Sequence, residues 1–404
     1  MKPYERIVVC VSRRRSLNQT IQRVTYSQWT KAAFIGFVLL VTVSTVTFKS
    51  NLHEVTFNWL MSDRFGIPNE SNVTPSSIEI LMWVPFFGNQ FGQEVFRICP
   101  ELNCHITHNR SALATSSAVV FHDRDVSVSD LPGERLPGQH FVFFLLESPY
   151  HVSGEAFNQL STNFYTLTMG YRRNADVHLP FGYFEARSKP LPSTFWHELR
   201  KLVAKRKKLV AWFVSNCNTP SAREFYVRQL QRYIPVDVYG HCGPLKCPRS
   251  NRNCYESVLK MNYKFYIAFE NSVCTDFVTE KYFDRLTNFV VPIVFGRKIY
   301  EAVGPNNSFI AADDFDGPKK LADYLKQLDK DDNEYLKYFE WMNNTEDFDQ
   351  TLRYTNGFCK LCRKLRQQGK NPIVTPSETA KHLTRWYKEP GICHDRYGLK
   401  VHKL

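Results

Sequence analysis

The sequence predicts an α/β fold with two doubly wound domains, preceded by a single transmembrane helix and a stem. Two series of short, continuously apolar runs predict strands that are buried on both faces, as in parallel sheets. Amphipathic stretches separate the runs of each series, and this alternation of strand and helix is typical of doubly wound folds. The chain of 404 residues, 43% of them hydrophobic, is also longer than one hydrophobic core normally spans.

The N-terminal region predicts a membrane anchor. Residues 32–48 form an uncharged apolar run between two lysines, near the short end of what crosses a bilayer as a helix. Residues 1–31 hold seven basic residues and one acid, so the positive-inside rule keeps this tail in the cytosol. A cleaved signal peptide is the alternative, but the basic region is too long and no small-residue cleavage site follows. We therefore expect a single-pass type II protein whose remaining residues lie in a lumen.

Cysteines and glycosylation signals agree with an oxidising lumen. Of the 11 cysteines, Cys10 lies in the predicted tail and the others, an even number, follow the membrane segment, which predicts disulfides. A zinc site that includes Cys359 and Cys362 is the alternative, but no paired histidines complete a tetrahedral ligand set. We expect both cysteines to be oxidised and to fasten the end of the chain to its core. Asparagine glycosylation signals beyond the membrane segment occur at Asn69, Asn72, Asn109, Asn306 and Asn343.

The net charge of +13 does not indicate nucleic-acid binding. The predicted cytosolic tail carries about half of this charge, and the remaining bases are scattered except at residues 205–208. Nucleic-acid binding requires a concentrated basic face with stacking aromatic residues. A modestly basic luminal part fits a small anionic substrate better.

The luminal part divides into a stem, two domains and a tail. Residues 49–76 are polar, rich in turn-forming residues and without periodicity, so they predict a stem. The first domain is assigned to residues 77–190, where apolar runs occur at 78–84, 118–121 and 141–146. The second domain is assigned to residues 205–365, where the runs are 209–214, 236–239, 265–269, 290–295 and 309–312. Residues 186–207, with prolines and then a basic run, predict the connection, and residues 366–404 the C-terminal tail.

Helix signals mark the segments between the strands of the second series. Thr219 can cap a helix that has Pro220 at its first position, because residues 222–234 carry a helical apolar period. Further helices are predicted at residues 279–287, 318–328 and 334–341. Ligands of doubly wound folds bind at the carboxyl ends of the strands. Polar residues that follow the predicted strands are therefore the candidates for a functional site.

Several motifs carry a resemblance to a known family. Residues 264–272 read KFYIAFENS, residues 275–281 read TDFVTEK and residues 291–296 read VPIVFG. Further matches are FFLLESP at 143–149 and FCKLC at 358–362. These motifs extend over roughly residues 77–365 and closely resemble the α1,3-fucosyltransferases, glycosyltransferase family 10. The resemblance implies a GT-B fold of two Rossmann-like domains, acceptor side first and GDP-fucose-binding side second, with inversion at the fucose carbon.

Glu147 is the candidate catalytic base. Sugar transfer needs a base for the acceptor proton, cations for the leaving diphosphate and hydrogen bonds that orient the donor. Glu147 follows a buried apolar run, and apolar neighbours would raise its pKa toward a value suited to a base. A lone glutamate in such a turn is more often solvated or salt-bridged. Its match to the Glu-Ser-Pro motif of the family implies the catalytic role.

Arg223, Lys281 and Glu280 are the main candidates for donor binding. Arg223 lies in the first turn of the predicted helix after Pro220, where free N–H groups and the helix dipole favour an anion. Lys281 supplies a second cation for the diphosphate, and Glu280 a carboxylate for ribose or fucose hydroxyls. An isolated Glu-Lys pair would carry no information, but this pair matches the donor site of the resembled family residue for residue.

Five further residues are assigned to GDP-fucose binding. Glu270 and Asn271 follow a predicted strand and either orient the donor or satisfy loop backbone groups. Asn216 and Tyr239 leave the same two options open. Phe277 stands where the family commonly has tyrosine, so a phenolic hydrogen bond to the donor is lost although the ring can still stack on it.

No residue is assigned as a metal ligand. Asp-x-Asp triplets of the kind used by metal-dependent glycosyltransferases occur at residues 123–125, 314–316 and 347–349, but such triplets are frequent in a chain with 39 acidic residues. Two phosphate-facing cations remove the need for an obligatory metal, although Mn²⁺ or Mg²⁺ can still stimulate GDP release. A metal-dependent transferase of another fold stays an alternative and predicts that Asp123 or Asp125 is essential. A second alternative is an inactive luminal protein that binds glycans.

The resemblance also implies the partners and the location of the chain. It implies GDP-fucose as the donor, a GlcNAc-containing N-glycan or other glycoconjugate as the acceptor, and the Golgi membrane as the location. Residues 239–247, YGHCGPLKC, and 385–393, RWYKEPGIC, look like the branch that modifies the core GlcNAc of N-glycans. Lewis-type enzymes that act on outer lactosamine share the other motifs, so the acceptor stays open. The oligomeric state stays open as well, with a homodimer among the options.

Overall fold

The structure, a computed structural model, describes residues 76–401 with gaps at 153, 161, 248–253, 348–351 and 370–371. The predicted cytosolic tail, membrane helix and nearly all of the stem lie outside the described residues, as do Asn69 and Asn72. Among the helices of the described residues, none combines the length and the apolar character that a bilayer span needs. The described asparagines of the glycosylation signals, Asn109, Asn306 and Asn343, are all exposed.

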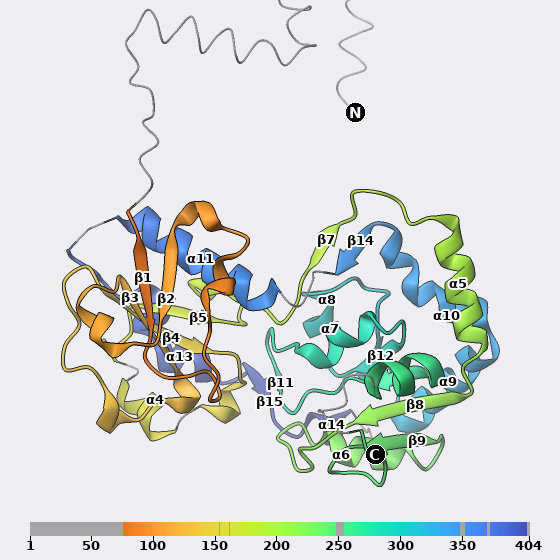
Figure 1. The fold of residues 1–404 in the computed structure, drawn as a ribbon. Coiled ribbons are helices and arrows are strands. Elements are labelled where there is room, and N and C mark those ends of the chain that lie inside the picture. The colour runs from red at the N-terminus through yellow and green to blue at the C-terminus, as the bar shows by residue number, and fades with distance from the viewer. Residues whose placement is uncertain are drawn as a thin grey trace, which may run out of the picture. The chain divides into compact units, whose positions relative to one another are not determined.

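The first sheet contains six parallel strands in the order β2-β1-β3-β4-β5-β6. Its central strands are continuously apolar and buried, as sheets covered on both faces require. Figure 1 shows this sheet with the strands in orange and yellow. The strands are β1 (Ile78–Met82), β2 (Cys104–Thr107), β3 (Ala118–His122), β4 (His140–Leu145), β5 (Leu167–Gly170) and β6 (Val177–His178).

The second sheet contains five parallel strands in the order β13-β12-β10-β8-β9. They are β8 (Lys208–Phe213), β9 (Val236–Tyr239), β10 (Tyr263–Ile267), β12 (Val291–Val294) and β13 (Ile310–Ala311). Each of the eight predicted apolar runs overlaps one of the strands of the two sheets, so the prediction of two parallel sheets is confirmed. The strands β2, β5 and β6 were not predicted. Strand β2 alternates buried and exposed residues at the sheet edge, and β5 and β6 are too short to stand out as apolar runs.

The predicted helices are present with shifted ends. They are α6 (Arg223–Leu230), α7 (Glu280–Leu286), α9 (Pro318–Lys330) and α10 (Asp332–Leu336), the last continued by a 3-10 helix over Lys337–Asn343. The predicted start of α6 was wrong. Ala222, in the left-handed region at φ 54°, precedes the first helical residue, and the Thr219 hydroxyl instead donates to Glu224 at 2.8 Å.

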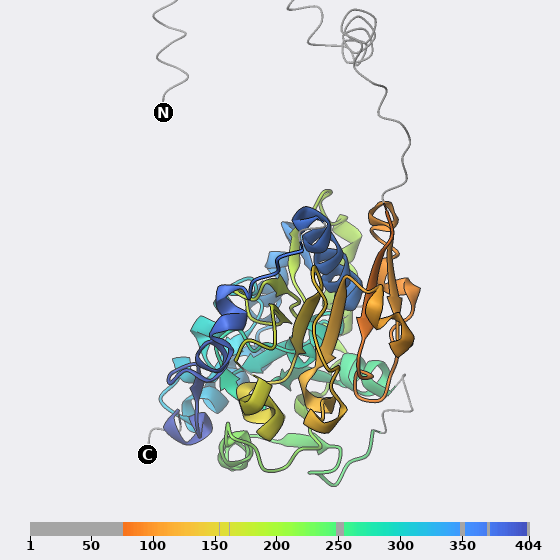
Figure 2. The ribbon, with the colours of Figure 1, turned by 90° about the vertical axis from the view of Figure 1, so that its left-hand side faces the viewer.

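Two of the helices that the sequence did not predict are long. The connection between the sheets contains α5 (Ser193–Ala204), which begins directly after Pro192. Residues 353–365, which the sequence placed with the second domain, belong to α11 (Arg353–Gln368) and pack against the first sheet. Figure 2, which views the molecule from the side of the first sheet, shows this blue helix beside the strands. Phe358, Leu361 and Leu365 join the apolar cluster of that sheet, and this burial explains where the helix docks.

The predicted C-terminal tail, residues 366–404, is folded over most of its length. Helix α12 (Glu378–Lys381) adds Ala380 to the apolar cluster of the first sheet, and α13 (Leu383–Lys388) adds Leu383 and Tyr387. The chain then pairs β15 (Cys393–His394) with β11 (Val273–Cys274) and ends in α14 (Tyr397–Lys400), which contacts α6 of the second sheet. The last part of the chain therefore contacts both sheets in turn.

Disulfides attach α11 and β15 to segments that come earlier in the chain. Cys359 bonds to Cys99 and Cys362 to Cys104, so the prediction that both cysteines are oxidised and fasten the end of the chain is confirmed. The remaining described cysteines form three more bridges, Cys217–Cys242, Cys247–Cys254 and Cys274–Cys393.

The two bridges of α11 are expected to be redundant. Their sequence separations are 260 and 258 residues, so either bridge alone still closes the same large loop. Replacing Cys99 and Cys359 by serine should therefore lower the free energy of unfolding by only about 2 kcal/mol, whereas removing both bridges should cost at least twice as much. Denaturant unfolding of the single-bridge and double-bridge variants measures this difference. Equal losses in the variants that lack one bridge and in the variant that lacks both would contradict the redundancy, because one bridge alone would then not stabilise the fold.

Candidate active site

The carboxyl ends of the two sheets meet at a pair of buried serines. Ser148 follows β4 and donates a hydrogen bond to Ser272, which follows β10, with 2.8 Å between the hydroxyl oxygens. Both side chains are completely buried. An ion pair adds a second link, since Arg173 Nε lies 2.8 Å from Asp276 Oδ1. The residues next to these serines, Glu147 and Asn271, are both candidate site residues, so the structure brings the two predicted halves of the site together.

Glu147 lies half-buried just beyond the end of β4. The hydroxyl of Tyr387 donates to its backbone oxygen and so helps to fix the turn. Burial raises the pKa of the Glu147 carboxyl, as the sequence predicted, while the charges of Lys281 and Arg124 oppose the rise. The carboxylate therefore interacts with the charge of Lys281 at the start of α7, a helix that contacts β12 of the second sheet.

If Glu147 is the general base, its raised pKa predicts how the reaction rate depends on pH. A general base acts in its deprotonated form, so kcat/KM should fall on the acid side at a pH above 4.5, the ordinary value for a glutamate. Because the Lys281 charge lowers this pKa, Lys281→Met should move the acid limb to higher pH. A pH profile of kcat/KM for both proteins measures the two shifts. If the acid limb does not move in the variant, the ionisation that controls the rate is not that of Glu147.

Lys281 is the centre of a charged cluster at the start of α7. Its ammonium group donates to Glu270 Oε2 at 2.9 Å, to Thr279 Oγ1 at 2.9 Å and to Glu280 Oε1 at 3.2 Å. Burial alone would lower the pKa of Lys281, but the two carboxylates raise it above its ordinary value. The side chain keeps 25% of its surface exposed. Lys281 is therefore a fixed, charged ammonium group that a ligand can still reach.

Glu270 is the buried carboxylate that binds Thr279 and Lys281 in this cluster. Its side chain is only 3% exposed, and its Oε1 accepts hydrogen bonds from the backbone N–H of Thr279 at 2.8 Å and from the Thr279 hydroxyl at 2.7 Å. The other oxygen holds Lys281. Glu270 thus satisfies loop and side-chain groups, one of the two roles that the sequence left open, and its contact with the donor stays a prediction. It orients Lys281 and the first turn of α7.

Arg223 lies behind the strand ends, in a more buried position than the sequence predicted. Its guanidinium donates to the backbone oxygens of Phe269 at 2.8 Å and Asn216 at 3.1 Å, and its side chain is 4% exposed. Burial lowers the pKa of Arg223, but a guanidinium stays protonated at neutral pH. It ties the loop after β8 to the end of β10. Its contact with a diphosphate stays a prediction.

The other predicted donor residues differ in how accessible they are. Asn216 is exposed in the loop after β8, while Asn271 is half-buried and its side-chain oxygen, which is buried, has no hydrogen-bond partner among the described residues. The hydroxyl of Tyr239 is paired with that of Tyr263 at 2.9 Å. Phe277 is 3% exposed and packs against Tyr171 with 5.1 Å between ring centroids, so its ring faces the core. The idea that this ring stacks on the donor is not supported by this packing.

Two residues near Glu147 escaped the sequence analysis. Arg124, which is exposed, lowers the pKa of Glu147, and Tyr387 fixes its backbone from a helix near the end of the chain. Both lie in segments that the sequence analysis quoted, the first as part of an Asp-x-Asp triplet and the second in RWYKEPGIC. Only the folding of β3 and α13 toward β4 shows that they belong to the site.

The aspartates of the Asp-x-Asp triplets have partners in the protein. Asp125 accepts from His122 Nδ1 at 2.7 Å and from the Phe87 backbone N–H at 2.8 Å. Asp314 is paired with Arg297, and the triplet at 347–349 lies partly outside the described residues. Within the described part of the chain, no group of three or more His, Cys, Asp or Glu side chains is arranged to hold a metal ion.

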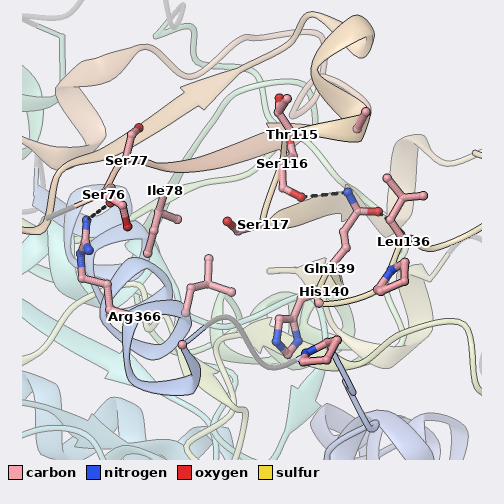
Figure 3. A pocket seen from close by; sticks show the side chains of 16 residues that line it. Ser76, Ser77, Ile78, Thr115, Ser116, Ser117, Leu136, Gln139, His140 and Arg366 are labelled. Atoms are coloured by element: carbon pink, nitrogen blue, oxygen red, sulfur yellow. Dashed lines mark hydrogen bonds between the residues drawn. The ribbon is translucent and has the colours of Figure 1, made fainter.

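A pocket of about 340 Å³ lies away from this site, at the amino ends of the strands of the first sheet. Figure 3 shows that Ile78 and His140, the first residues of β1 and β4, line it. Hydrogen bonds from Gln139 to the Ser116 backbone and from Arg366 to the Ser76 backbone close its walls (Figure 3). Because parallel strands begin here, the pocket is not part of the site at their carboxyl ends.

Comparison with known proteins shows to which family the chain belongs. The family model described as "Fucosyltransferase, N-terminal" matches residues 75–182, and "Glycosyltransferase family 10 (fucosyltransferase) C-term" matches residues 203–386. The α-(1,3)-fucosyltransferase C of Drosophila melanogaster is 34% identical over 352 residues, which cover 78% of this chain and 80% of the relative.

Two further proteins are similar to this chain. The glycoprotein 3-α-L-fucosyltransferase A of Drosophila melanogaster is 35% identical over 321 residues, which cover 76% of this chain and 59% of that protein. A crystal structure of an α1,3-fucosyltransferase with GDP matches at 18% identity and a TM-score of 0.48, covering 76% of this chain and 95% of that one. The two family models and the Drosophila relatives show that the chain belongs to glycosyltransferase family 10, the fucosyltransferases.

Proposed function

We propose that the chain is an inverting α1,3-fucosyltransferase, which transfers L-fucose from GDP-fucose to the 3-hydroxyl of a GlcNAc residue. The observation that carries this proposal is the hydrogen bond between Ser148 and Ser272, which brings the Glu147 end of the first sheet next to the loop of the second sheet that leads to Lys281. The names of the Drosophila relatives support the same reaction.

The proposed chemistry is a single displacement. Glu147 accepts the proton of the acceptor 3-hydroxyl as that oxygen forms a bond to the anomeric carbon of fucose. The bond from this carbon to the β-phosphate oxygen breaks, and its electron pair leaves with GDP. Lys281 stabilises the negative charge that grows on the diphosphate, with Arg223 adding positive charge behind the strand ends. Glu280, whose side chain is 42% exposed, is available to the donor hydroxyls.

The arrangement of the two sheets supports a GT-B enzyme in which one domain binds the acceptor and the other binds the donor. In this proposal the first sheet, with Glu147, receives the acceptor, and the second sheet, with Lys281 and Arg223, binds GDP-fucose. A divalent ion is then helpful rather than essential, because protein cations face the diphosphate. If the alternative of a metal-dependent transferase holds, Asp125→Asn should abolish transfer by removing a ligand. In the proposed enzyme that substitution should disturb only the contacts of Asp125 to His122 and Phe87.

We further propose a Golgi membrane location with a luminal catalytic part. Five disulfides in the described residues support an oxidising compartment. For the acceptor we propose the core GlcNAc of N-glycans, since one Drosophila relative carries "glycoprotein" in its name and the segments 239–247 and 385–393 look like the core-modifying branch. Outer lactosamine is the second candidate.

An acceptor panel tests the proposal. The full chain, purified in detergent, is incubated with GDP-fucose and with core N-glycan, lactosamine or LacdiNAc acceptors, and products are identified by mass spectrometry. We expect the core N-glycan to gain one fucose. Preference for lactosamine would move the chain to the Lewis-type group, and glycan binding without any transfer would support the inactive glycan-binding alternative.

A further inference from the structure

The last described residues, 392–401, wrap around the loops at the carboxyl end of the second sheet. We call this segment the C-terminal hook. It begins with the disulfide Cys274–Cys393 and with a backbone hydrogen bond from Thr275 to Ile392 at 2.7 Å. These contacts attach it to the loop after β10, which also carries Asn271 and leads to Thr279 and Lys281. The hook lies beyond residue 386, where the match to the family model ends.

The hook next contacts the turn that precedes α6. The backbone N–H of Arg396 donates to Pro220 at 2.7 Å, and that of Gly398 donates to Ser221 at 2.8 Å. The loop after β10 holds the same turn from its other side. The backbone N–H of Ser221 donates to the backbone oxygen of Asn271 at 3.0 Å, and the Ser221 hydroxyl donates to the backbone oxygen of Glu270 at 2.8 Å. The turn is therefore fixed between the hook and the residues that carry the Lys281 cluster.

Glycine is required for this contact. A Cβ at position 398 would lie 2.5 Å from the backbone oxygen of Ala222, a distance that real Cβ atoms do not tolerate. Ala222 is itself in the left-handed region and directly precedes Arg223. A larger residue at 398 must therefore push on the residue that sets the position of Arg223.

The hook also reaches the loops after β12 and β13. The Tyr397 hydroxyl donates to Asp313 at 3.2 Å, and its ring lies 5.7 Å from that of Phe295. Asp313 in turn accepts from the backbone N–H groups of Gly296 at 2.9 Å and Arg297 at 3.1 Å. One short segment thus braces the loops that follow β8, β10, β12 and β13.

We propose that the C-terminal hook is a positioning element of the donor site, which sets the geometry of the 219–223 turn and of the loop from 270 to 281 for GDP-fucose. The inference rests on the proposed function. It acts through other residues, because the contacts that carry it are to loop backbone and to Asp313. Small displacements of groups that bind a reacting substrate are costly, so a shift of this turn should weaken donor binding.

Gly398→Ala in the full chain tests the hook, with Gly133→Ala as the matched control, because a Cβ at 133 meets no described atom within 4 Å. We expect Gly398→Ala to raise the KM for GDP-fucose and the Kd for GDP on the order of tenfold, while the acceptor KM stays unchanged. The control should match the wild type. Unchanged donor KM and GDP Kd, with only a lower melting temperature, would mean that the hook is merely structural and would overturn the proposal.

A second variant covers the case in which Gly398→Ala does not fold. Tyr397→Phe keeps the ring and removes only the hydrogen bond to Asp313, and we expect it to raise the Kd for GDP on the order of threefold. No change in a folded Tyr397→Phe protein would overturn the proposal in that case. GDP binding is read without turnover, so it distinguishes the two hypotheses. If the wild type binds GDP but transfers no fucose, the proposed function fails while the binding comparison still decides on the hook.

Discussion

Glu147→Gln is expected to lower turnover by about two to four orders of magnitude, because the amide keeps the shape of the side chain but cannot accept the acceptor proton. The binding of GDP should barely change. Glu147 lies at the end of the first sheet, and the groups with which the second sheet is proposed to bind the nucleotide stay in place. The measurements are kcat for fucose transfer and the Kd for GDP by calorimetry.

The control for this variant is Glu101→Gln, since Glu101 is exposed on the side of the first sheet. It should behave like the wild type in both measurements. Near-normal turnover of Glu147→Gln, or a loss of GDP binding together with turnover, would make the carboxylate structural. Glu270 is not a ready substitute for the base, because its burial and its bonds to Thr279 and Lys281 leave it poorly placed to meet an acceptor.

Lys281→Ala is expected to lower kcat/KM by about two to three orders of magnitude and also to weaken GDP binding. The ammonium group is proposed to contact the diphosphate both in the bound donor and in the transition state, so both constants should change. The variant also removes the counter-charge of Glu270, which is 3% exposed. Leaving a buried charge without its partner is destabilising, so the melting temperature should fall as well.

The double variant Glu270→Gln, Lys281→Met separates these two effects. With no charge left unpaired, the melting temperature should recover toward that of the wild type, because replacing both members of a buried pair is far less costly than removing one. Activity and GDP binding should stay low, since the cation is still missing. Recovery of GDP binding together with stability would show that Lys281 acts only as a structural partner of Glu270.

The central strands of both sheets could be predicted because burial on both faces leaves continuous apolar runs such as AVVF and VPIV. The same signal was missing for β2, an edge strand in which a buried and an exposed residue alternate. The docking of α11 could not be predicted either. Its cysteines predicted disulfides, but the helix itself was not predicted, and the partners Cys99 and Cys104 lie more than 250 residues earlier in the chain.

The candidate site was predicted as a set of loops more accurately than as a set of side chains. Glu147, Asn271 and Lys281 follow strand ends that the structure brings together, as doubly wound topology requires. The direction of each side chain depends on tertiary packing. Tyr239, at the end of β9, and Phe277, in the loop before α7, therefore proved to face buried partners. Arg223, at the start of α6, proved to bind backbone oxygens.

The linkage and configuration of the product test the central claim most directly. Wild-type protein, GDP-fucose and a GlcNAc-containing N-glycan should yield, by nuclear magnetic resonance of the purified product, one α-linked fucose on the 3-oxygen of GlcNAc, the inverted configuration that a single displacement with Glu147 as base predicts. A β-linked product, transfer to another hydroxyl, or no transfer by a protein that binds GDP-fucose would contradict it.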